Sequence, residues 1–133
     1  MNDAELVKRA FAMHQFSHVP YSKFPVGAAL LCADGTVFTG CNVENAAFGS
    51  TICAERTALL KAISEGHRED WTAIAIAGRG EDYCWPCGAC RQMLYEFAPD
   101  LRVIAARGDG DFQAASLADL LPHGFGPKSL IRK

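Results

Sequence analysis

Three cysteines and one glutamate stand at spacings that suit metal-assisted hydrolysis. Cys53 begins a Cys-Ala-Glu motif that ends at Glu55, and further along the chain Cys87 and Cys90 form a Pro-Cys-x-x-Cys motif. A pair of this spacing can share one ion, and three thiolates leave the fourth tetrahedral position of zinc open for water. Glu55 is close enough to exchange protons with that water without being a ligand. The sequence therefore predicts one catalytic Zn²⁺ per chain.

A site with three thiolate ligands carries a formal negative charge, which weakens its ability to acidify water. Arg56 directly follows the glutamate of the Cys-Ala-Glu motif. A guanidinium that donates hydrogen bonds to the ligand sulfurs withdraws part of this charge. We therefore expect the Arg56 guanidinium to interact with the ligand sulfurs and not with the ion itself.

The cysteines also permit two other interpretations. Cys84 would be the fourth ligand of a closed structural zinc site, although such a site has no use for Glu55. The tetrapeptide Cys-Trp-Pro-Cys that begins at Cys84 is similar to a thioredoxin-type redox motif, which leaves the Cys-Ala-Glu motif unexplained. Cys32 and Cys41 lie in strand patterns and are expected to be ordinary buried thiols. None of the four histidines has ligand spacing with the cysteines, so surface or capping roles are expected.

Hydrophobic periodicity predicts the elements that position these groups. Helices are predicted over residues 2–17, 53–66, 87–98 and 116–121, and strands over residues 25–33, 36–43, 71–78, 101–106 and 111–115. Asp34-Gly35 suits the tight turn of a hairpin between the first two strands. Both zinc-ligand motifs fall at helix N-termini, where the helix dipole favours thiolate. Strands separated by helices favour parallel pairing, so we expect an α/β fold with a mixed sheet and helices on its faces.

Length and charge restrict the function classes. The chain has 133 residues, half of them hydrophobic, and is expected to form a single domain over residues 1–133. A formal charge of −2 gives no reason to expect nucleic acid as a partner, which favours a small-molecule substrate. No secretory leader or long apolar segment is evident, so we expect a cytoplasmic protein without a membrane partner.

The chain resembles the small, homotetrameric branch of the cytidine deaminase family. Five collinear segments carry the resemblance: PYSKFPVGAAL from Pro20, GCNVENAA from Gly40, CAERTA from Cys53, PCGACRQ from Pro86 and LLPHGFGP from Leu120. The resemblance implies a three-layer α/β/α fold around a mainly five-stranded mixed sheet. It also implies zinc-dependent hydrolysis of cytidine and deoxycytidine to the uracil nucleosides, with release of ammonia, in pyrimidine salvage.

The resemblance also implies roles for the residues around the substrate. Phe24 lines the nucleoside pocket, and Asn42 and Glu44 hydrogen-bond the sugar hydroxyls. Their i, i+2 spacing at a strand end independently places both side chains on one side. The backbone N–H of Ala54 contacts the base carbonyl, and Glu55 contacts the ring nitrogen that becomes protonated.

Other residues are expected to complete the site of a neighbouring subunit. The resemblance implies that Ala46 and Phe48 lie in a loop that reaches a neighbour, and that Phe125 closes over the base from another subunit. The alternative for Phe125, between two glycines, is that it packs on its own core. Phe48 stands where many members have Tyr, and Trp85 is bulkier than the usual small residue, so both positions depart from the family pattern.

Three rival functions share parts of this pattern. A deaminase of a nucleoside antibiotic has the zinc motifs, but the intact NVENAA segment argues against it. A nucleic-acid-editing deaminase needs a basic, aromatic-lined channel, and the chain shows no cluster of Lys or Arg. A zinc-stabilised interaction domain would keep the cysteines without needing Glu55.

Overall fold

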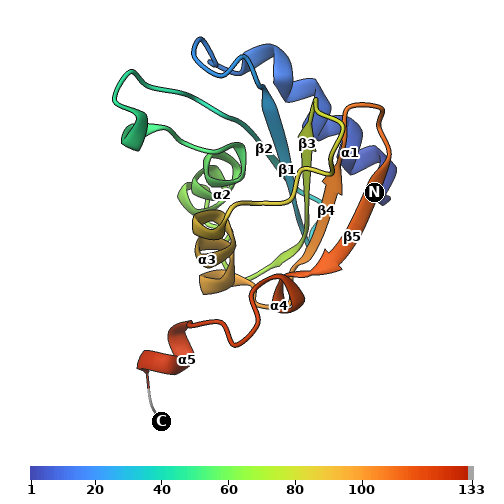
Figure 1. The fold of residues 1–133 in the computed structure, drawn as a ribbon. Coiled ribbons are helices and arrows are strands. Elements are labelled where there is room, and N and C mark those ends of the chain that lie inside the picture. The colour runs from blue at the N-terminus through green and yellow to red at the C-terminus, as the bar shows by residue number, and fades with distance from the viewer. Residues whose placement is uncertain (132–133) are drawn as a thin grey trace.

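One mixed five-stranded sheet forms the centre of the molecule. The structure is a computed structural model that describes residues 1–131, and Figure 1 shows its ribbon. The strand order is β2-β1-β3-β4-β5, and only the β3–β4 pair is parallel. The strands are β1 (Val26–Cys32), β2 (Val37–Cys41), β3 (Trp71–Gly78), β4 (Arg102–Ala106) and β5 (Phe112–Ser116).

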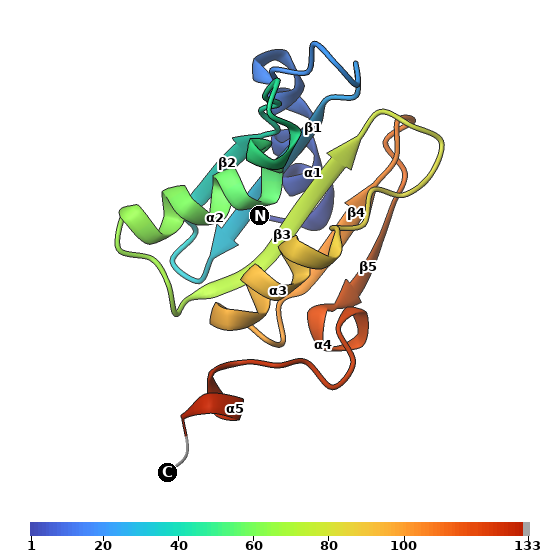
Figure 2. The ribbon, with the colours of Figure 1, turned by 60° about the vertical axis from the view of Figure 1, so that its left-hand side comes forward.

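Helices cover both faces of the sheet. One face packs against α1, while α2 and α3 lie side by side on the other (Figures 1 and 2). This arrangement confirms the expected three-layer α/β/α fold. The helices are α1 (Asp3–Ala12), α2 (Ala54–Ser64), α3 (Gly88–Phe97), α4 (Leu117–Leu120) and α5 (Pro127–Leu130), with 3₁₀ turns η1 (Met13–Phe16) and η2 (Phe48–Ser50).

The two cores follow from the alternation of side chains along the central strands. On β3, Ile74 and Ile76 face the core under α2 and α3, while the intervening alanines face α1. Small residues on the α1 face let that helix approach closely, and a Cβ at Gly27 would collide with the Ala10 carbonyl. On the other face, Gly40 of β2 lies against the backbone of Ala54, where any Cβ would clash. This close approach fixes the start of α2 on the sheet.

The observed elements differ from the sequence prediction in four places. The chain leaves β2 after Cys41, because Val43 pairs with His18 and Ile52 outside the sheet. The first helix ends at Ala12 and tightens into η1, and the short α5 was not predicted. The helix α2 connects β2 to β3, which run parallel, but β1 lies between these two strands in the sheet. The only neighbouring strands that pair in parallel are therefore β3 and β4, which α3 connects.

Among residues 1–131, no helix combines the length and the apolar character needed to cross a bilayer.

Candidate metal centre and active site

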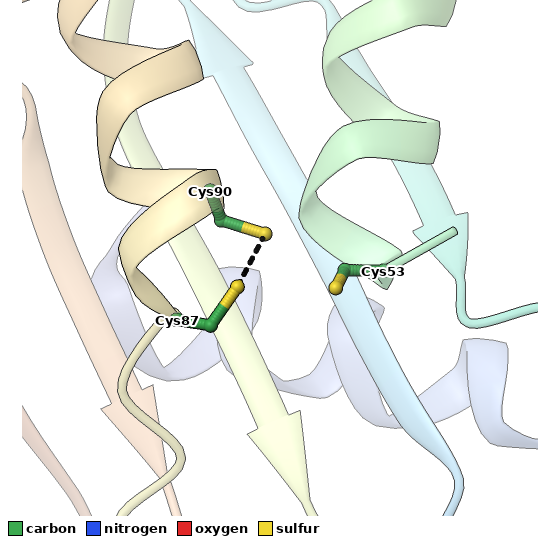
Figure 3. A group of neighbouring side chains, drawn as sticks. All are labelled: Cys53, Cys87 and Cys90. Atoms are coloured by element: carbon green, nitrogen blue, oxygen red, sulfur yellow. Dashed lines mark hydrogen bonds between the residues drawn. The ribbon is translucent and has the colours of Figure 1, made fainter. Parts of the chain in front are cut away.

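The sulfurs of Cys53, Cys87 and Cys90 converge between the first turns of α2 and α3. All three lie within 4.8 Å of one another, and the Sγ atoms of Cys87 and Cys90 are 3.5 Å apart (Figure 3). Cys53 is the N-cap of α2 and Cys87 that of α3, so two helix N-termini meet at this point. Zn–S bonds of about 2.3 Å in tetrahedral geometry separate sulfurs by about 3.8 Å. The donor set and its spacing therefore fit one zinc ion.

The fourth-ligand interpretation of Cys84 does not match this geometry. Within residues 1–131, the group of ligating atoms around Cys53 contains no sulfur besides those of Cys87 and Cys90. Cys84 lies instead beside Phe24, and burial raises the pKa of its thiol to about 11. Three sulfurs leave a coordination position open, as a catalytic site requires.

Hydrogen bonds and charge stabilise one thiolate of the group before any metal binds. The Cys90 thiol donates toward Cys53, and with Arg56 this lowers the pKa of Cys53 to about 5. The Arg56 guanidinium donates to Cys53 Sγ at 3.3 Å and to the Thr51 carbonyl at 3.5 Å. The pKa of Cys90 is raised by its interaction with Cys53 and by the burial of its sulfur. Arg56 thus brings positive charge to the sulfur cluster.

Glu55 is the one buried charged side chain among residues 1–131, with 5% of its surface exposed. It lies in the first turn of α2, two residues after Cys53. Burial raises its pKa, and the nearby Cys53 thiolate raises it further. A carboxyl group with a raised pKa can both take and give a proton near neutral pH. The site therefore combines three metal donors with a general acid–base group.

Comparison with known proteins decides between the families that use such a site. The sequence model of the cytidine and deoxycytidylate deaminase zinc-binding region matches residues 1–106. The chain belongs to this deaminase family. The cytidine deaminase of Halalkalibacterium halodurans is 48% identical over 126 residues, which cover 94% of this chain and 95% of that protein.

Solved structures of cytidine deaminases have the same fold. The enzyme from Burkholderia pseudomallei superposes with a TM-score of 0.91 at 46% identity, covering 94% of this chain and all of that one. The Mycobacterium tuberculosis enzyme superposes with a TM-score of 0.82 at 37% identity, covering 95% of this chain and 98% of that one. The sulfur cluster and the sheet that carries it thus lie within a deaminase fold.

The Asn42 side chain is hydrogen-bonded to the backbone of the segment that carries Phe24. The Asn42 amide donates to the Phe24 carbonyl and accepts from the Val26 N–H, both at 2.9 Å. The Phe24 ring lies over Gly78 and Gly80, where a Cβ would come within 3.3 Å of it. Asn42 therefore positions the segment that carries Phe24. Sequence reasoning assigned Asn42 to the sugar and missed this role, because its partners are backbone groups.

Glu44 and Phe48 belong to the segment between β2 and α2, in which Phe48 begins η2. Glu44 accepts hydrogen bonds from the N–H groups of Tyr21 and Ser22, both at 3.1 Å, and these bonds lower its pKa. Phe48 is 72% exposed and meets the Tyr21 ring edge-on at 5.6 Å. Glu44 and Phe48 line one cavity of about 440 Å³, together with Tyr21, Ser22 and Thr51. Glu44 is thus held as a carboxylate in an open depression.

Phe125 does not pack on the core of its own chain. Its side chain is 56% exposed, while its carbonyl accepts a hydrogen bond of 2.7 Å from Gln92 of α3. The flanking Gly124 and Gly126 lie against the Tyr95 ring, where a Cβ would clash. The backbone here is held firmly while the aromatic ring faces outward. Ala46 is also exposed, and Ala54 is buried as the first residue of α2, where the N–H lacks a partner within the helix.

Arg91 positions the loop that carries Cys87, a role that the sequence did not predict. Its guanidinium donates to the Pro86 carbonyl at 2.7 Å and to the Leu120 carbonyl at 2.8 Å. It thereby fixes the loop before α3, which carries Cys87, against α4. The available signal was its position directly after the second cysteine of the Cys-x-x-Cys motif.

Proposed function

We propose that the protein is a zinc-dependent cytidine deaminase that converts cytidine and deoxycytidine to uridine and deoxyuridine in pyrimidine salvage. The observation that carries this proposal is the convergence of three cysteine sulfurs at two helix N-termini, with the buried Glu55 beside them. Family membership across most of the chain supports the substrate class. The reaction consumes water and releases ammonia from C4 of the base.

Cys53, Cys87 and Cys90 are the residues that hold the ion. Zinc bound there supplies a Lewis acid that lowers the pKa of water to near neutrality. Glu55 takes one proton from the attacking water and delivers it to N3 of the base, and then carries the second proton of that water from the new C4 hydroxyl to the departing amino group, which leaves as ammonia. Its burial supports this role, because a carboxyl with a raised pKa is an effective proton donor near pH 7.

The substrate is positioned by groups from the segment before Cys53 and by the first residue of α2. We place Phe24 against the nucleoside, Asn42 and Glu44 at the sugar hydroxyls, and the N–H of Ala54 at the base carbonyl. The Glu44 carboxylate, with its lowered pKa, disfavours a phosphorylated sugar by charge repulsion. The free nucleoside is therefore the preferred substrate over the nucleotide.

We further propose that four copies of this single-domain chain assemble into a cytoplasmic homotetramer with shared active sites. Large apolar side chains are exposed in its loops and C-terminal segment, including Phe16, Tyr21, Phe48, Phe125, Leu130 and Ile131. The segment that ends in α5 extends away from the body of the molecule (Figures 1 and 2). In this assembly Ala46 and Phe48 reach one neighbour's site, and Phe125 closes over the base of another. Exposed aromatic side chains of this kind are typical of subunit interfaces.

The test is a parallel assay of cytidine, deoxycytidine, CMP and cytosine, following absorbance loss and ammonia release. We expect turnover of both nucleosides, with little reaction of the nucleotide or the free base. Equal turnover of CMP would contradict the sugar-side assignment of Glu44. Absence of ammonia from all four would overturn the proposed activity.

A further inference from the structure

A second group of metal-ligating side chains lies at the far end of α2. Cys32, His67 and Asp70 each offer one ligand atom, and these atoms lie within 4.8 Å of one another. Cys32 ends β1, while His67 and Asp70 belong to the loop between α2 and β3. Figure 2 shows this loop beside the turn that joins β1 to β2. Residues distant in the sequence therefore meet at one place.

The backbone around this group is firmly held. The Ala33 N–H donates to the Asp70 carbonyl at 2.7 Å, and the His67 N–H donates to the Ala62 carbonyl at 2.9 Å. The Trp71 indole donates to the His67 carbonyl at 3.0 Å. The backbone at His67 and Asp70 is therefore fixed by hydrogen bonds that do not involve the candidate ligand atoms.

One oxygen of the group lacks a partner. The Asp70 Oδ1 atom is buried and accepts no hydrogen bond within residues 1–131, whereas Oδ2 lies 2.8 Å from His67 Nδ1. A buried carboxylate oxygen without a donor is costly. A cation bound at this oxygen would remove that cost. The Asp34 carboxylate lies 3.9 Å from His67 Nε2 and adds negative charge at the same place.

We propose that Cys32, His67 and Asp70 form a second metal site, which takes Zn²⁺ or a similar divalent ion such as Co²⁺. A sulfur, an imidazole nitrogen and a carboxylate oxygen match the mixed donor sets that these ions accept. Binding releases the thiol proton of Cys32 to solvent, and His67 binds as the neutral imidazole.

This second site is independent of the three-cysteine site and of the proposed deaminase activity. The 11 residues of α2 separate the two, which corresponds to about 16 Å of helix. It contains no buried glutamate, and its ligands come from a strand end and a loop rather than from helix N-termini. The ion ties the end of β1 to the loop between α2 and β3, so the role of the site is to stabilise this end of the sheet.

The decisive measurement is cobalt titration of protein that already holds one equivalent of zinc. We expect a second equivalent to bind, with a thiolate-to-cobalt charge-transfer band in the near ultraviolet. Metal analysis after gel filtration gives the stoichiometry. Zinc added in place of cobalt should raise the melting temperature above that of the protein with one equivalent.

Two variants test the ligands, each with a matched control. Cys32→Ser should lose the charge-transfer band, while Cys41→Ser, which alters a cysteine outside both groups, should keep it. Asp70→Asn should lose the second equivalent and the thermal shift. Its control is Glu69→Gln, which removes the same charge from the exposed neighbouring position.

The second-site proposal is overturned if the wild-type protein binds only one equivalent. It is equally overturned if a second equivalent binds unchanged to both Cys32→Ser and Asp70→Asn. Asp70 is partly exposed, so Asp70→Asn provides a folded variant even if serine at the buried position 32 destabilises the chain. Loss of the second equivalent with normal deamination separates this site from the catalytic one.

Discussion

The metal side and the proposed substrate side of the site are built in different ways. The sulfurs and Glu55 are carried by the first turns of two helices packed on the sheet, and Glu55 is buried within a single chain. The substrate-side groups lie in loops, and two of their aromatic rings, Phe48 and Phe125, are largely exposed. One chain therefore brings together three metal donors and a buried carboxyl group, while the aromatic rings that we assign to the nucleoside stay exposed. Proton transfer and metal binding should depend on one subunit, while substrate affinity should depend on assembly.

Replacing Glu55 by Gln should produce the largest effect, because it removes the proton carrier and keeps its shape. We expect kcat to fall by about 10³-fold or more, at the upper part of the range for general acid–base groups. Zinc content should remain at one equivalent in the three-cysteine site. The melting temperature should not fall, because burying an ionised Glu55 is costly, as its raised pKa indicates.

Steady-state kinetics, metal analysis and thermal unfolding check these expectations together. The control is Glu65→Gln, an exposed glutamate at the other end of α2. Turnover of the Glu55→Gln variant close to that of the wild type would show that the proton carrier lies elsewhere.

Replacing Arg56 by Ala should weaken the metal side without touching the substrate side. The guanidinium donates to Cys53 Sγ, and its loss removes positive charge from the sulfur cluster. We expect zinc affinity to fall by about 10- to 100-fold, as is typical of groups that support metal ligands. Competition with a chromophoric chelator measures this change. The Arg56→Lys variant keeps the positive charge but lacks the planar arrangement of N–H donors, so its zinc affinity should lie between those of the wild type and Arg56→Ala. Zinc affinity and activity that both match the wild type would remove this role.

Replacing Phe125 by Ala should change the substrate side alone. If its ring covers the base in a neighbouring site, the lost apolar contact raises KM by about 10- to 100-fold. Zinc content should stay the same. The control is Leu60→Ala, which truncates an exposed side chain on α2. Sedimentation and activity of the wild type at increasing dilution provide the second readout, and a dissociated monomer with full activity would contradict the shared site.

Strands, turns and helix ends were predictable where apolar runs and glycines in the sequence determine them. The strand over residues 71–78 was predicted at its observed bounds, because its sequence is apolar apart from Thr72 and both of its faces are buried beyond that residue. The turn at Gly35 and the end of α2 before Gly66 also match, since both glycines have φ of +91°. Convergence of the sulfurs was expected only because each ligand motif begins a helix, and the structure adds that both helices pack on the same face of the sheet.

What local patterns could not give is the order of strands and the contacts that depend on it. β1 lies between β2 and β3, and this long-range pairing places Cys32 opposite Trp71. That register brings Cys32 to His67, although no motif links their positions in the sequence. The role of Asn42 was missed for a similar reason, since its side chain bonds to the backbone of a segment that folding brings beside it.

The smallest expected effect is a pH-dependent change in stability from Glu44→Gln. Hydrogen bonds from Ser22 and Tyr21 lower the pKa of Glu44 below its ordinary value of 4.5, so the unfolded chain takes up this proton more readily. The stabilisation is therefore present above pH 4.5 and is lost as the pH falls through the lowered pKa. Thermal unfolding should show wild type slightly more stable than Glu44→Gln at pH 7, with the difference disappearing toward pH 3. A difference that is constant from pH 7 to pH 3 would mean that the carboxylate charge does not hold this loop. Glu81→Gln, at an exposed loop position, provides the control.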